Sequence, residues 1–149
     1  MNSQALADDP IFRLTLRCGA VYYFLDRQFS SPQPHYFIVV NANPLADETL
    51  LLVVCASDLE KVTRRRRGLP PETLVIISQG EYHEFSQDTI VDCNHVLERP
   101  ASLLSEKKKA GDLGEYLDKL PAAVLRKIII GIHKSPTVKS EVISRIPSV

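Results

Sequence analysis

The fold class is decided by one stretch of sequence, Thr49-Leu50-Leu51-Leu52-Val53-Val54-Cys55. Its apolar residues are consecutive instead of alternating with polar ones, and the stretch is far shorter than the ~20 residues that span a membrane. A short apolar run of this kind is typical of a β-strand that is covered on both faces. Residues 35–40 form a second such run, followed by Asn41-Ala42-Asn43-Pro44, where asparagine and proline favour a turn. We therefore expect two strands inside a sheet with two covered faces.

Three more strands are predicted on either side of these two runs. They are expected at residues 19–25, 73–78 and 89–93, which are rich in β-branched and aromatic side chains.

The connections between the strands carry local signals of their own. Residues 26–34 contain two serines and two prolines and are expected to form an exposed loop, while residues 79–88 form a polar, hairpin-like connection. Ser57 is followed three residues later by Glu60, a capping-box pattern that predicts a short helix ending before Gly68.

The last third of the sequence is helical. Residues 121–133 begin with a proline, which suits the first turn of a helix. Five apolar side chains then share one helical face: Val124, Leu125, Ile128, Ile129 and Ile132. Residues 100–109 predict one or two further helical turns before Gly111. The fold class is therefore mainly β with α: a small, strongly bent antiparallel sheet or partly open barrel of five strands, closed at one side by the C-terminal helix.

The chain length of 149 residues suits one domain with its own core. We expect this domain to span residues 1–149, with a core at about 19–135, an N-terminal extension at 1–12 and a C-terminal tail at 136–149.

The cysteines and the N-terminus indicate a cytoplasmic location. Cys18, Cys55 and Cys93 are odd in number and lack C-x-x-C spacing, which fits reduced thiols. Asp8 and Asp9 stand where a secretory signal would need apolar residues.

Composition and motifs exclude several classes of function. The sequence contains no glycine-rich phosphate-binding motif, and its potential metal ligands are isolated, so we expect neither a cofactor nor a metal site. The 18 basic and 18 acidic residues balance, which argues against a basic surface over the whole molecule.

The positive charge is nevertheless concentrated locally. Lys61, Arg64, Arg65, Arg66 and Arg67 are five of the 18 basic residues within seven positions. This cluster is either a solvated surface or a loop whose guanidinium groups contact phosphates. Residues 107–109, three lysines, form a second and weaker patch of the same kind.

Histidine is the side chain best suited to proton transfer near neutral pH, and among the four histidines His35 lies where a loop enters a strand. The other reading is a solvent-facing histidine at a strand start. His83 is expected to be exposed, and His95 lies near Cys93 without a recognisable metal or nucleophile motif. Tyr22, Tyr23 and Tyr36 are either core residues or platforms for stacked bases: both readings stay open.

The order of these elements resembles the MazF/PemK toxin family, the ribonuclease half of bacterial type II toxin–antitoxin pairs. The strings that carry the resemblance are Gly19-Ala20-Val21-Tyr22, residues 36–41, Cys55-Ala56-Ser57, residues 85–91 and residues 113–135. It covers residues 19–135.

The resemblance implies an SH3-like barrel, a homodimer, an antitoxin partner, and cleavage of single-stranded RNA without metal through a 2′,3′-cyclic phosphate. The family has an arginine ahead of the second strand and a threonine closing the third. Here these positions fall on residues 33–35 and on Ala56, beside Ser57.

The predicted catalytic residues are accordingly His35 and Ser57, and the predicted RNA-binding residues are Lys61, Arg64, Arg65, Arg66 and Arg67. The alternative is a catalytically inactive barrel homologue that binds a protein or a nucleic acid.

Overall fold

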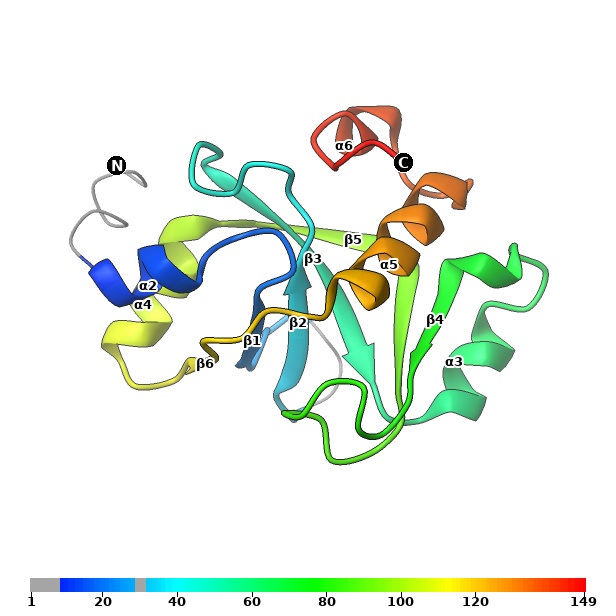
Figure 1. Cartoon of the computed structure of the whole chain (residues 1–149), viewed down its shortest axis with the longest axis horizontal. Helices are drawn as coiled ribbons and strands as arrows, with labels where there is room; N and C mark the ends of the chain where they lie inside the picture. Colours follow the sequence, from blue (N-terminus) through cyan, green and yellow to red (C-terminus); the bar gives the residue numbers. More distant parts are fainter. Residues whose placement is uncertain (1–8, 29–31) are drawn as a thin grey trace.

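A computed structural model describes residues 9–28 and 32–149, so three residues of the loop expected at 26–34 lie outside the described part. The described residues form a six-stranded sheet in the order β4-β5-β3-β2-β1-β6 (Figure 1). The strands are β1 (Val21–Phe24), β2 (His35–Val39), β3 (Thr49–Ala56), β4 (Leu74–Ile77), β5 (Thr89–Pro100) and β6 (Gly114–Glu115). Every neighbouring pair in this sheet is antiparallel.

Strand β3 lies inside the sheet, between β2 and β5, and its apolar run is buried on both faces. Successive side chains of a strand point to opposite faces. Leu51, Val53 and Cys55 therefore enter one core, and Leu50, Leu52 and Val54 enter the other. The expectation of two covered faces is confirmed.

Helices cover both faces (Figure 1). Helix α5 (Ala122–Lys134) packs its apolar side chains, including Ile128 and Ile132, into the first core. Helices α2 (Pro10–Thr15) and α4 (Ala101–Lys109) pack Phe12 and Leu104 into the second core. The predicted face of the helix at 121–133 is thus the face that is buried.

Three short helices complete the described chain. They are α3 (Leu59–Arg65), η1 (Pro71–Thr73) and α6 (Ser140–Ile143). Near the C-terminus, Val142 and Ile146 join the core beneath α5. No helix in the described part of the chain has the length and apolar character needed to cross a membrane.

The fold-class prediction, mainly β with a C-terminal helix, is confirmed, and the structure refines it. The sheet is open, with β4 and β6 at its two ends, and it has six strands instead of five. The added strand β6 is only two residues long, too short to give a periodic signal.

Two predicted boundaries were wrong. Strand β5 continues seven residues beyond Cys93, to Pro100, because its polar residues are accommodated in the strand: the side chain of Asn94 is buried and hydrogen bonded to Thr73 and Ser135. The residue that caps α3 is Asp58 instead of Ser57, since an Asp58 carboxylate oxygen accepts a hydrogen bond from the amide of Lys61 at 3.0 Å.

Candidate active site

A pocket of about 500 Å³ opens where the start of β2, the end of β3 and the first turns of α3 meet. Four of the predicted site residues line it together: His35, Ser57, Lys61 and Arg65. They come from three elements that are separated in the sequence, so the fold itself assembles this group.

Strand register places His35 beside the end of β3. In the β2–β3 pair, Tyr36 lies opposite Cys55, and the antiparallel direction brings His35 next to Ala56. His35 is half-buried, and its ring meets the edge of the Phe37 ring at a centroid separation of 6.4 Å. The histidine at the strand start therefore faces a pocket that Ala56 and Ser57 also line.

Helix α3 presents two cations to the same pocket. Lys61 and Arg65 are four residues apart, which puts them on one face of a helix. Val62, which follows Lys61 in the sequence, is 3% exposed and anchors the helix to the protein. The helix thus delivers an ammonium and a guanidinium group beside His35 and Ser57.

The structure separates the predicted RNA-binding residues. Arg64, Arg66 and Arg67 line a different hollow on the opposite side of α3. A helix advances 100° per residue, so Arg64 points about 100° away from Arg65, and Arg66 and Arg67 follow the last residue of the helix. Of the four arginines, Arg65 alone lines the pocket with His35.

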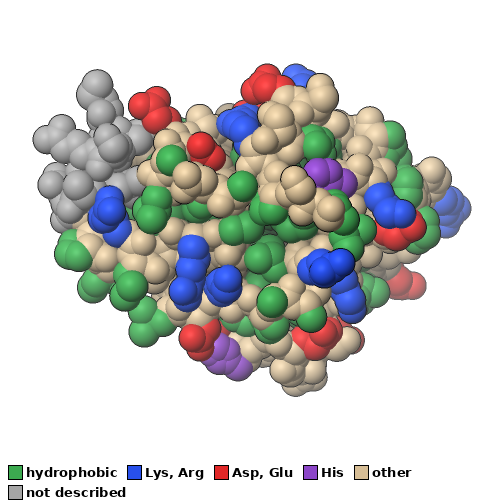
Figure 2. Space-filling model, turned by 45° about the horizontal axis from the view of Figure 1, so that its top comes forward, with side chains coloured by type: hydrophobic (Ala, Val, Ile, Leu, Met, Phe, Trp, Pro, Cys, Tyr) green, Lys and Arg blue, Asp and Glu red, His purple; other side chains and the backbone are tan. Residues whose placement is uncertain are grey.

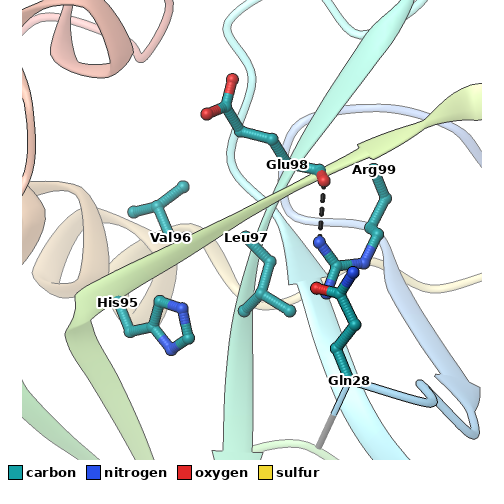
Figure 3. A pocket seen from close by; sticks show the side chains of 6 residues that line it. All are labelled: Gln28, His95, Val96, Leu97, Glu98 and Arg99. Atoms are coloured by element: carbon teal, nitrogen blue, oxygen red, sulfur yellow. Dashed lines mark hydrogen bonds between the residues drawn. The ribbon is translucent and has the colours of Figure 1, made fainter.

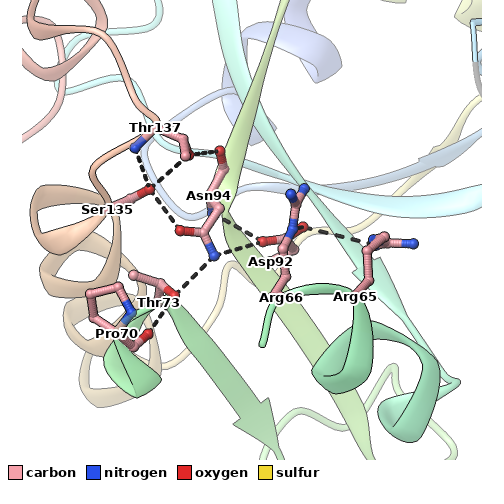
Figure 4. Close-up of polar contacts among 8 residues, drawn as sticks. All are labelled: Arg65, Arg66, Pro70, Thr73, Asp92, Asn94, Ser135 and Thr137. Atoms are coloured by element: carbon pink, nitrogen blue, oxygen red, sulfur yellow. Dashed lines mark hydrogen bonds and ion pairs between the residues drawn. The ribbon is translucent and has the colours of Figure 1, made fainter. Parts of the chain in front are cut away.

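A buried polar network holds the C-terminal end of α3 against β5 (Figure 4). Arg66 Nε donates to Asp92 Oδ2 at 2.7 Å, and Arg65 Nη2 lies 3.9 Å from the same oxygen. Asp92 also accepts from the backbone and side-chain nitrogens of Asn94, both at 3.1 Å. The carboxylate therefore orients the helix end that carries Arg65.

Aromatic rings form one wall of the pocket. The Tyr23 and Tyr36 rings lie 4.6 Å apart, and the Phe85 ring meets Tyr36 edge-on at 4.7 Å. The centroids of the Tyr36 and Tyr116 rings lie 6.0 Å apart. Burial and a hydrogen bond to Tyr36 raise the pKa of the Tyr116 hydroxyl. Tyr22, by contrast, is fully buried in the second core and is not available to stack a base.

Sequence reasoning did not assign Asp58, Phe85, Gln87 and Thr89 to this site, although all four line the pocket. A signal was present for Phe85, which opens the string at residues 85–91. Gln87 and Thr89 belong to the same string, and the packing of the β4–β5 connection brings them to the pocket, whereas Asp58 lines it from the start of α3.

The remaining histidines have other surroundings. His83 is exposed, with Nε2 3.1 Å from a carboxylate oxygen of Asp118. His133 Nε2 lies 2.7 Å from the carbonyl oxygen of Pro147. His95 lines a separate hollow of about 390 Å³ along β5, with Glu98 and Arg99 (Figure 3).

Two of the three cysteines belong to the core. Cys55 and Cys93 are 4% and 0% exposed, and burial raises the pKa of both thiols. Within residues 9–28 and 32–149, no group of three or more His, Cys, Asp or Glu side chains is arranged to hold a metal ion.

Charged side chains of both signs are interspersed with hydrophobic ones over the face shown in Figure 2. On this face, neither positive nor negative side chains predominate. Among the described residues that line the pocket, Lys61 and Arg65 supply its positive charge.

Comparisons with known proteins support the fold. No protein-family model and no curated protein matches the sequence. A solved structure of an endoribonuclease in complex with its cognate antitoxin, from Mycobacterial species, matches with a TM-score of 0.52 and 14% sequence identity. The match covers 83% of this chain and 97% of that chain. This chain therefore shares the fold of an endoribonuclease that pairs with an antitoxin.

Proposed function

We propose that this protein is an endoribonuclease that cleaves single-stranded RNA by transesterification, in the manner of a MazF/PemK-like toxin. One observation carries the proposal: His35, Ser57, Lys61 and Arg65 line a single pocket. A proton acceptor, a hydroxyl donor and two cations are the groups that this reaction needs around one phosphate. The shared fold with an endoribonuclease supports the same reading.

In the proposed reaction, the His35 imidazole takes the proton of the ribose 2′-hydroxyl. The 2′ oxygen attacks phosphorus, the bond from phosphorus to the 5′ oxygen breaks, and the departing oxygen takes a proton from solvent. The products are a 2′,3′-cyclic phosphate and a 5′-hydroxyl. No metal is required, because the nucleophile belongs to the substrate.

Lys61, Arg65 and Ser57 stabilise the negative charge that develops on the phosphorane oxygens. Arg65 presents five N–H donors in a fixed plane, and its contact with buried Asp92 limits its motion. In this chain the guanidinium group comes from α3, whereas the family pattern has it ahead of the second strand. Ser57, next to Ala56, contributes a hydroxyl at the end of β3.

The proposed partners follow from the same comparison. The matching endoribonuclease is bound to its cognate antitoxin, and we infer that an antitoxin also silences this chain. We also infer that the protein acts in the cytoplasm as a homodimer with an SH3-like architecture, as the family resemblance implies.

The proposal is tested with purified protein and single-stranded RNA in the presence of EDTA. We expect cleavage to fragments that end in a 2′,3′-cyclic phosphate, identified by mass spectrometry. His35→Ala should lower the rate about 10²–10⁴-fold, the usual contribution of a general base. The matched control is His95→Ala, on β5 and outside the pocket.

Intact RNA at high concentrations of folded protein would contradict the enzymatic proposal and favour the binding-module alternative. Binding of RNA without cleavage, weakening as salt rises, would identify that module as one for nucleic acid.

A further inference from the structure

A second groove, of about 630 Å³, lies on the other side of α3 from the catalytic pocket, between α3 and β4. Its sheet side is apolar, formed by Leu74, Ile76 and Ile90. Arg64 and Arg67 on the helix side bring positive charge to it. The groove thus combines an apolar floor with basic residues.

Strand β4 is an edge strand, which pairs with β5 and has no strand on its outer side among the described residues (Figure 1). Its inward side chains, Val75 and Ile77, are buried in the core beneath α5. Ile76 points the other way, toward the groove, and is 51% exposed. An edge with exposed β-branched residues is a template for an added strand.

Arg64 and Arg67 are both exposed at this groove. In the part of the chain that the structure describes, neither Arg64 nor Arg67 forms an ion pair, whereas Arg66 is held by Asp92. Glu60 is the one carboxylate that lines the groove. The unmatched positive charge therefore selects for a ligand with carboxylates.

A second copy of this chain does not meet that requirement at the same edge. Strand β4 reads Leu74-Val75-Ile76-Ile77 and contains no carboxylate. Pairing two β4 edges would therefore bring no carboxylate of the strand itself to Arg64 and Arg67.

We propose that this groove binds an extended acidic segment of a partner protein, which adds to β4 as an edge strand. The face of the segment that meets the groove carries apolar side chains, which pack beside Leu74 and Ile76, and carboxylates, which pair with Arg64 and Arg67. This surface is separate from the pocket that contains His35. The inference therefore does not depend on RNA cleavage.

The test uses a fluorescein-labelled peptide of about eight residues, the length of an ordinary strand. Valine and glutamate take turns at every second position, so that both face the groove, and threonine fills the positions between them. Its counterpart has lysine in place of glutamate. We expect fluorescence anisotropy to show binding of the acidic peptide only, weakening with salt. Hydrogen exchange should slow in β4 when the acidic peptide binds.

Two variants locate the contact. Arg64→Gln combined with Arg67→Gln should weaken binding at least about tenfold, the loss expected from one charge-assisted hydrogen bond. Ile76→Ser, at an exposed position, should weaken binding without unfolding the protein. The matched control, Arg126→Gln with Lys127→Gln, removes two exposed charges from α5 and should change binding less than about twofold.

Three results would overturn the proposal: no binding of the acidic peptide to the unaltered protein, equal binding of the lysine peptide, or exchange in β4 that stays unchanged when the acidic peptide binds. A single-stranded oligoribonucleotide is tested on the same variants. If the double arginine substitution weakens RNA binding more than peptide binding, the groove is an RNA-binding surface and the peptide proposal fails. His35→Ala should leave peptide binding unchanged, so a failure of the cleavage proposal is seen separately.

Discussion

Arg66 on the C-terminal side of α3 donates a hydrogen bond through Nε to Oδ2 of Asp92 on β5, at 2.7 Å. The Asp92 side chain is only 4% exposed, whereas that of Arg66 is 25% exposed. This contact ties a surface helix to a strand that runs through the sheet. Both the pocket that contains His35 and the groove between α3 and β4 use α3 as a wall, so the shape of both depends on this attachment.

The first prediction concerns this attachment. Asp92→Asn should lower the free energy of unfolding by about 1–3 kcal/mol, because Arg66 would lose its charged acceptor in a partly buried position. Urea unfolding followed by circular dichroism measures the change. Asp112→Asn, at an exposed position, is the matched control. If both substitutions lowered the free energy of unfolding equally, the buried ion pair would stabilise the protein no more than an exposed carboxylate does.

The second prediction concerns Arg65. Arg65→Gln should lower kcat/KM for RNA cleavage by about 10²–10³, the loss that follows removal of one preorganised donor to a charged transition state. Arg126→Gln, on the exposed side of α5, should leave cleavage unchanged. A rate for Arg65→Gln equal to that of the unaltered protein would remove Arg65 from the proposed mechanism.

The third prediction is a pH dependence that arises from Asp26. Burial by itself would raise the pKa of this carboxyl, but hydrogen bonds from Arg99 and from the amide of Gln28 hold the pKa below its ordinary value of 3.8. The pair therefore contributes its full stability above about pH 4, and that stability is lost as the pH falls through the folded-state pKa.

Asp26→Asn should accordingly cost about 3 kcal/mol at pH 7, the typical effect of breaking a buried pair. The difference from the unaltered protein should shrink below about pH 4, where the unaltered carboxyl also becomes protonated. Urea unfolding at pH 7, 4 and 3 measures it. A difference that stays constant over this range would contradict the assignment.

The fourth prediction concerns the close approach of α5 to η1. A Cβ atom at Gly131 would lie 2.6 Å from the carbonyl oxygen of Glu72 and 3.0 Å from Cys93 Sγ. Gly131→Ala should therefore destabilise the protein by about 1–3 kcal/mol through overpacking. Helix propensity alone predicts the opposite sign, a gain of up to about 1 kcal/mol. A rise in the melting temperature of this variant would show that α5 can shift without cost.

Much of the fold was predictable because its signals are local. The apolar runs that form β2 and β3 predict strands with two covered faces. The spacing of Val124, Ile128 and Ile132 predicts the buried face of α5. The length of β5 was not predictable in this way. Its polar residue Asn94 is stable in a buried strand only because Thr73 and Ser135 supply partners from elsewhere in the chain.

For the candidate site, too, the residue types could be predicted from the sequence, but their positions in space could not. The sequence marked His35, Ser57 and the basic cluster as residues with useful chemistry. It could not show that Arg65 and Lys61 join His35 while Arg64 and Arg67 face away from it, because that depends on which face of α3 packs against the sheet.

By itself, the sequence determined the strand-forming runs, the amphipathic helix and the groups able to carry out chemistry, since each depends on neighbouring residues only. The tertiary structure alone decided the pocket and the groove. The long-range register that sets Tyr36 opposite Cys55 brings His35 to the end of β3, and burial of Val62 fixes the rotation of α3. Residues far apart in the chain meet because strand pairing and side-chain burial act between elements. A local pattern of residues does not predict those contacts.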